Sequence, residues 1–151
     1  MQNEQSMWVL GHLITPVESN PEFALALGET PPGMEGPPPH YHRSCEELFS
    51  VIEGEMTFFL DGEWLTLGPG ETIKLKKEQL HTFKNASDKT LRYVNVHYPG
   101  GFERVFAKMG IPANEPDAFE RSLSKESVAN VMQIVQDPLN DFLVPVSEKA
   151  E

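Results

Sequence analysis

Closely spaced turn residues are the feature that most limits what this chain can fold into. Between Met7 and Tyr98, glycine, proline, asparagine and aspartate divide the chain into segments that are too short for ordinary helices. The Asp61-Gly62 pair, which has apolar residues on both sides, is a strong signal for a β-hairpin. We therefore expect short strands at Trp8–Ile14, Phe23–Leu27, Glu47–Ile52, Met56–Leu60, Trp64–Leu67, Thr72–Leu75, His81–Lys84 and Leu91–Tyr98.

Short strands at this spacing predict an all-β jelly-roll barrel or a sandwich over about residues 7–98. The densest run of turn residues, Thr30–Pro39, cannot form a helix or a central strand. We interpret it as a stiff loop that delivers the next strand, in preference to a polyproline ligand for a partner domain.

A change of pattern follows Pro99-Gly100-Gly101 and predicts a helical segment over about residues 99–146. Phe102–Met109 has helical spacing, and Ser124 is placed to cap a second helix with one apolar stripe. At 151 residues the chain is expected to form a single domain, with these helices packed outside the barrel and carrying no chemistry.

The charge balance excludes two classes of partner. The chain has 23 acidic and 12 basic residues and a net charge of −11, which argues against binding to nucleic acid or to an anionic membrane. Its single cysteine, Cys45, cannot form an internal disulfide. The N-terminal pattern fits neither a signal peptide nor a membrane span, so we expect a cytoplasmic protein.

Histidine pairs and nearby carboxylates indicate a metal site. In His40-Tyr41-His42 the two histidines point to the same face of a strand, about 6.6 Å apart, which lets both imidazoles reach one metal ion. Strict alternation puts Glu46 on that face, whereas a bulge after His42 would put Glu47 there, and periodicity does not choose between them. With His81, which opens a later strand, these residues would suit Fe, Mn, Co, Ni, Zn or Cu as a divalent ion.

Two motifs in this region resemble those of the cupin family. The segment from Gly36 to Gly54 resembles the first cupin motif, and Gly70 to Asn85 resembles the second, with Lys76 and Glu78 in place of the usual proline and glycine. The resemblance covers about residues 33–98. More loosely, the Pro-Gly-Gly-Phe-Glu-Arg segment that follows resembles single-domain cupins of the quercetin-dioxygenase-like type.

The resemblance implies a cupin double-stranded β-helix in which one divalent transition metal is held by His40, His42, Glu47 and His81. Residues in phase with these ligands are expected to line a pocket for one small molecule. Phe49, Val51 and Phe83 meet that criterion. On the last predicted strand, either Tyr93, Asn95 and His97 face the pocket, or Val94 and Val96 do.

Three functions agree with this site. The first is a dioxygenase acting on a small enolic or phenolic substrate of the quercetin type, with Glu47 as the general base. The second is a metal-dependent isomerase, lyase or decarboxylase acting on a small polar acid or sugar derivative, where Lys74, Lys76 or Lys77 near the second motif would bind an acidic substrate unless they only solvate a strand edge. The third is a binding protein without catalysis.

The apolar segment Met7–Leu10 lies outside the motif region. An apolar strand of this kind tends to pair with another chain or to be covered. We therefore expect a two-fold symmetric homodimer.

Overall fold

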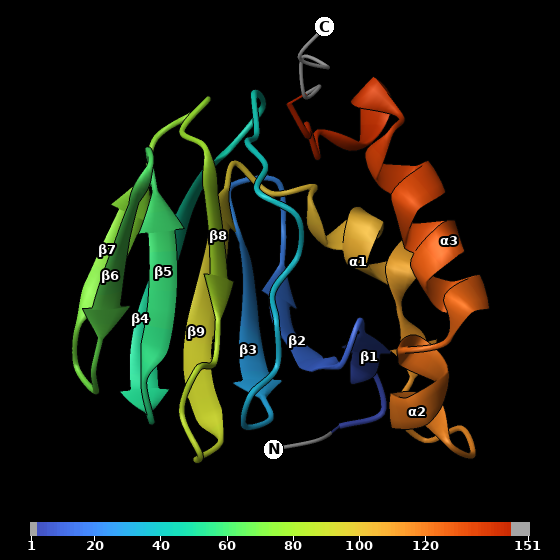
Figure 1. The fold of residues 1–151 in the computed structure, drawn as a ribbon. Helices are drawn as coiled ribbons and strands as arrows, with labels where there is room; N and C mark the ends of the chain where they lie inside the picture. The colour runs from blue at the N-terminus through green and yellow to red at the C-terminus, as the bar shows by residue number, and fades with distance from the viewer. Residues whose placement is uncertain (1–2, 146–151) are drawn as a thin grey trace, which may run out of the picture.

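The computed structural model describes residues 3–145 and places its strands in two sheets (Figure 1). The larger sheet has the order β10-β1-β2-β3-β9-β4-β7, and the smaller one has the order β6-β5-β8. The strands are β1 (Met7–Val9), β2 (His12–Ser19), β3 (Ala24–Thr30), β4 (Glu46–Glu53), β5 (Met56–Leu60), β6 (Glu63–Leu67), β7 (Thr72–Leu75), β8 (His81–Lys84), β9 (Leu91–Tyr98) and β10 (Ile111–Pro112).

Most of the strand predictions agree with these bounds, and the predicted strand Trp8–Ile14 is wrong. The chain reverses at Leu10 and Gly11, whose φ angles are 48° and 82°, and β1 and β2 pair as an antiparallel hairpin. A two-residue turn with two positive φ angles is the connection that suits a tight hairpin. The continuous apolar character of the segment hid this turn, because a leucine rarely adopts a positive φ.

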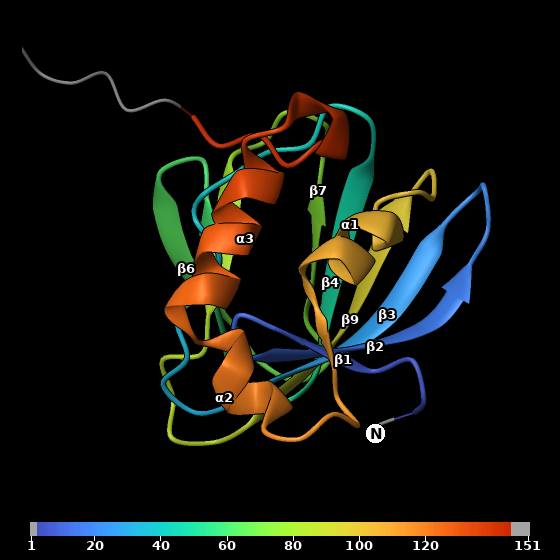
Figure 2. The same cartoon turned by 90° about the vertical axis from the view of Figure 1, so that its right-hand side faces the viewer.

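The helical segment lies along one side of the barrel (Figures 1 and 2). It consists of α1 (Glu103–Met109), α2 (Ala118–Ser122), α3 (Lys125–Val135) and the 3-10 turn η1 (Pro138–Asn140). The Ser124 side chain accepts a hydrogen bond from the amide of Ser127, which confirms the predicted cap of α3. The predicted end of this segment, residue 146, lies outside the described residues.

The N-terminal strand β1 is covered by the same chain. Its two edges pair with β2 and β10, and the Trp8 ring packs edge-on against Phe119 of α2 with a centroid distance of 4.9 Å. The strand therefore offers no free edge to a second copy, and the homodimer stays a prediction that this strand does not support. In the described part of the chain, no helix has the length and apolar character needed to cross a membrane.

Two apolar clusters flank the interior of the barrel. One joins β4, β5 and β9 through residues such as Phe58 and Leu91, which are fully buried. The other joins the helices to β1 and β2, with Val105, Met109 and Val131 at its centre. The polar residues described next lie between these clusters, so the fold surrounds them with apolar surface on both sides.

Candidate metal centre

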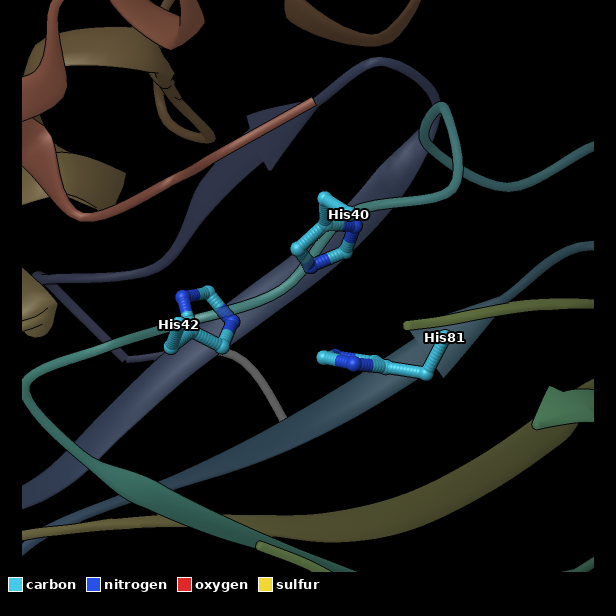
Figure 3. A group of neighbouring side chains, drawn as sticks. All are labelled: His40, His42 and His81. Atoms are coloured by element: carbon cyan, nitrogen blue, oxygen red, sulfur yellow. The ribbon is translucent and has the colours of Figure 1, made fainter. Parts of the chain in front are cut away.

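Three histidines from two distant parts of the sequence converge inside the barrel (Figure 3). A two-way backbone bridge joins His40 to His81, with N–O distances of 3.0 and 2.8 Å. The His40 ring centroid lies 4.4 Å from that of His81 and 5.0 Å from that of His42. One ring nitrogen from each of the three lies within 4.8 Å of the others, which is close enough to share one ion.

Backbone carbonyls fix the orientation of all three rings. The Nδ1 of His40 donates to the carbonyl of Pro38 at 2.9 Å, and that of His81 donates to the carbonyl of Gln79 at 2.9 Å. The Nδ1 of His42 donates to the carbonyl of Asp141. A histidine that donates through Nδ1 presents its Nε2 lone pair, which is the arrangement found in metal-ligating histidines.

Glu47, and not Glu46, is the carboxylate inside the barrel. Glu47 is 4% exposed, whereas Glu46 lies half-buried on the other face of β4. The irregular segment after His42 resets the alternation of side chains, and it therefore puts Glu47 instead of Glu46 on the inward face. The Oε2 of Glu47 lies 3.0 Å from the Nε2 of His81 and 3.3 Å from the Nε2 of His42.

The other carboxylate oxygen of Glu47 is held by β9. Its Oε1 accepts a hydrogen bond from the Nδ2 of Asn95 at 2.9 Å and lies 3.1 Å from the Nε2 of His97. Asn95 and His97 are buried and share the inward face of β9 with Tyr93. Of the two orientations that the sequence left open for this strand, the structure has the one with these polar residues inside.

Four buried atoms of this cluster lack a hydrogen-bond partner among residues 3–145. They are the Nε2 atoms of His42, His81 and His97 and the Oε2 of Glu47. Leaving a buried polar atom unsatisfied costs about 1–3 kcal/mol, so such a group requires an explanation. Two histidine-containing groups have ligand atoms within 4.8 Å of one another, namely His40, His42 and His81, and His42, Glu47 and His97. Imidazole nitrogens and a carboxylate oxygen are donors that a divalent transition metal prefers. The residues present therefore fit a metal ion.

Burial and mutual charge shift the pKa values of these groups. Burial acts to raise the pKa of Glu47, but His97 and His81 beside it hold that pKa well below its usual range. Burial, together with His81 and His42, lowers the pKa of His40 well below its usual range. Burial also acts to lower the pKa of His42, but Glu47 outweighs it and raises that pKa. The cluster thus contains an anionic carboxylate and a neutral His40, as metal binding requires.

A cavity of about 80 Å³ adjoins the donors. Four residues predicted to line the pocket lie on its wall, namely Phe49, Phe83, Tyr93 and Asn95. Val51 does not lie on this wall and instead packs in the apolar cluster of β4, β5 and β9. His97 is also absent from the wall; its Nε2 contacts the Oε1 of Glu47, and its ring stacks on Phe102 with a centroid distance of 4.5 Å.

The helical segment also contributes to the wall, which corrects the expectation that it only packs outside. The aromatic and aliphatic side chains that close the cavity on this side are Phe102, Phe106, Met109, Val131 and Phe142. The Phe142 ring stacks on His40 with a centroid distance of 3.8 Å and an interplanar angle of 11°. Sequence reasoning missed these residues because an apolar helical stripe has the same pattern whether it meets a core or a ligand cavity.

The two remaining candidates for chemistry are structural. His12 is buried, with its Nε2 2.9 Å from the carbonyl of Glu35 and its Nδ1 2.9 Å from the hydroxyl of Thr30. Cys45 is buried, and burial raises the pKa of its thiol, which makes the thiol a poor nucleophile.

Comparisons with known proteins agree with this geometry. A family model described as Cupin domain matches residues 26–97. Quercetin 2,3-dioxygenase of Bacillus subtilis (strain 168) is 32% identical over 103 residues, which cover 67% of this chain and 30% of that protein. The chain spans only 30% to 36% of the length of the curated relatives it matches.

Solved structures show the same fold. The structure of KdgF from Halomonas sp. matches with a TM-score of 0.59 and 18% identity, over 67% of this chain and 92% of that one. An RmlC-like cupin from Shewanella frigidimarina NCIMB 400 matches with a TM-score of 0.58 and 20% identity, over 66% of this chain and 89% of that one.

Proposed function

This chain belongs to the cupin family, and we propose that it is a metal-dependent dioxygenase acting on a small enolic or phenolic substrate. The observation that carries the proposal is a set of buried, unsatisfied imidazole and carboxylate atoms at the wall of an aromatic cavity. The similarity to a quercetin dioxygenase supports the reaction class by analogy only.

His40, His42, His81 and Glu47 would hold the metal. When bound, a redox-active divalent ion supplies Lewis acidity and one-electron chemistry with O2. The Asn95 amide orients Glu47 by binding its Oε1, and this leaves Oε2 directed at the histidines. When Glu47 does not hold the metal, that oxygen would be placed to take the proton of a substrate hydroxyl, so Glu47 is the proposed general base. The substrate is then oxidised, O2 is reduced, and both oxygen atoms enter the organic product.

The cavity favours a flat, apolar substrate of about one ring. Sites for drug-sized ligands enclose roughly 300–1,000 Å³, whereas this cavity encloses about 80 Å³. Phe49 and Phe83 provide two aromatic surfaces with a centroid distance of 5.4 Å. Aromatic rings of this kind pack well against a planar ligand. The small volume thus favours a phenol or a short enol over a three-ring flavonol.

The wall of the cavity argues against an acidic substrate. Among the described residues that line it, there is no lysine or arginine. Lys74, Lys76 and Lys77, which an acidic substrate would need, are exposed and do not line the cavity. A carboxylate would enter an apolar cavity beside the Glu47 anion, and both desolvation and repulsion oppose that. We therefore place the isomerase, lyase and decarboxylase alternatives second.

The test begins with elemental analysis of protein purified without chelators. We expect stoichiometric metal in the wild type and its loss when His40 and His42 are both replaced by alanine. Oxygen uptake is then measured with catechol and with simple enols such as 1,3-diketones, on protein reloaded in turn with each candidate metal.

Glu47→Gln is compared with Glu46→Gln, a matched control on the opposite face of β4. Loss of oxygen uptake in the first variant alone is the expected result. Turnover without O2 would instead favour a lyase or an isomerase. Metal binding without any turnover would favour a binding protein.

A further inference from the structure

The short segment Asp141–Leu143, here called the strap, lies against the loop that carries two of the metal-site histidines. Leu143 forms a two-way backbone bridge with Tyr41, with N–O distances of 2.9 and 3.0 Å. The side chain of Phe142 stacks on His40. The strap is about 100 residues away along the chain, and it lies outside the region that the family model matches.

Asp141 accepts three N–H hydrogen bonds from this loop and also a weak one from the Cys45 thiol at 3.9 Å. Its carboxylate accepts hydrogen bonds from the amide of Arg43 at 2.6 Å and from the amide of Ser44 at 2.9 Å. Its backbone carbonyl accepts the hydrogen bond from the Nδ1 of His42. The carboxylate therefore holds the loop in place, and the carbonyl sets the direction of the His42 ring.

The backbone of Asp141 explains why this residue suits the position. Its φ angle is 53°, in the left-handed region that aspartate, asparagine and glycine tolerate better than other residues. The preceding Asn140 is anchored to the helices, since its Nδ2 donates to the carbonyl of Ile134 and its Oδ1 accepts from Lys108. The strap is thus fixed at the helical side as well as at the His42 loop.

We infer that Asp141 is a positioning residue for His42, and that the strap is a working part of the metal centre. This inference rests on the metal binding in the proposed function. The other two histidines are oriented by carbonyls two residues before them in the chain, which the local backbone provides. His42 alone of these three depends on a carbonyl from a distant segment. Partners that orient a ligand in this way typically contribute about 10- to 100-fold to metal affinity.

The test compares Asp141→Gly with Asp117→Gly in the full-length protein. Glycine accepts a positive φ, so the first variant removes the carboxylate without straining the backbone. Asp117 is a matched control, because it also has a left-handed φ, of 54°, and its side chain makes no capping hydrogen bond at the start of α2. The probe is Co²⁺ alone, with affinity measured by competition with a chelator and coordination followed by visible absorption.

Asp141→Gly keeps the carbonyl that orients His42 but removes the carboxylate that holds the loop against it, so we expect it to bind Co²⁺ more weakly, by up to about 10- to 100-fold, and with a changed absorption spectrum. Asp117→Gly should match the wild type in both respects. Asp141→Asn keeps one acceptor oxygen and should lose less affinity than Asp141→Gly. Thermal unfolding of the metal-free proteins separates this effect from a general loss of stability.

The possible failures are distinguishable. A wild type that binds no Co²⁺ would overturn the proposed function, and the inference with it. A wild type that binds Co²⁺ with the same affinity and spectrum as Asp141→Gly would overturn the inference alone. If Asp141→Gly does not fold, Asp141→Asn decides: unchanged affinity and spectrum in that variant would also overturn it.

Discussion

The buried His12 is expected to make the stability of the metal-free protein fall as the pH falls. Its Nε2 donates to the carbonyl of Glu35, and its Nδ1 accepts from the hydroxyl of Thr30. This is the neutral ring with its proton on Nε2. Burial disfavours the charged ring and lowers the pKa of His12 from 6.5 to about 4, although the hydrogen bond to Glu35 acts to raise it.

The sign and size of the effect follow from this pKa. Between pH 6.5 and about 4 the unfolded chain binds a proton at His12 and the folded chain does not. Stability is therefore fully present above pH 6.5 and decreases as the pH falls toward 4. At about 1.36 kcal/mol per pH unit, the total loss from this residue is about 3 kcal/mol.

Urea unfolding of chelator-treated protein at several pH values within this window would measure the effect. His40 contributes in the same direction, because its pKa is also lowered. The informative quantity is therefore the pH dependence of the free energy of unfolding in the wild type compared with that in His12→Gln. For His12→Gln, the plot of the free energy of unfolding against pH should be less steep than for the wild type by up to about 1.4 kcal/mol per pH unit. Equal slopes in the two proteins would refute the reasoning, whatever their absolute stabilities.

Two further predictions concern packing around the cavity. Phe142→Ala removes the ring that stacks on His40, and it should lower the free energy of unfolding in urea by about 3 kcal/mol; a loss below about 1 kcal/mol would contradict the observed packing. Gly28→Ala would place a Cβ 2.1 Å from the ring of Tyr93, and it should cost about 1–3 kcal/mol in the same assay. Gly68→Ala is the control, since its Cβ would meet only the Glu71 side chain at 3.8 Å. Equal effects of the two alanines would show that Tyr93 moves aside freely.

Local signals in the sequence were enough to predict most of the elements. The Asp61-Gly62 turn lies between β5 and β6, as a hairpin pair should, and Ser124 caps α3. Both signals depend on residues that are neighbours along the chain. The Leu10-Gly11 turn was missed, because one of its residues favours a different conformation in isolation and adopts this one within the sheet.

The donors of the site show the same division. Spacing within one strand brings His40 and His42 together, and the family motifs add Glu47 and His81. The contact between His97 and Glu47 was not predicted, because it depends on the register between β9 and β4, which are far apart in sequence. No periodic pattern in either strand determines how the two are aligned with each other.

The sequence by itself determined the strand-rich fold and the identity of the donor residues, since turn chemistry and side-chain chemistry are local properties. Only the tertiary structure decided which face of β9 lines the interior and that the strap holds His42. These outcomes depend on packing between segments up to about 100 residues apart. Their energies come from burial and hydrogen bonds that exist only once the chain has closed around the site.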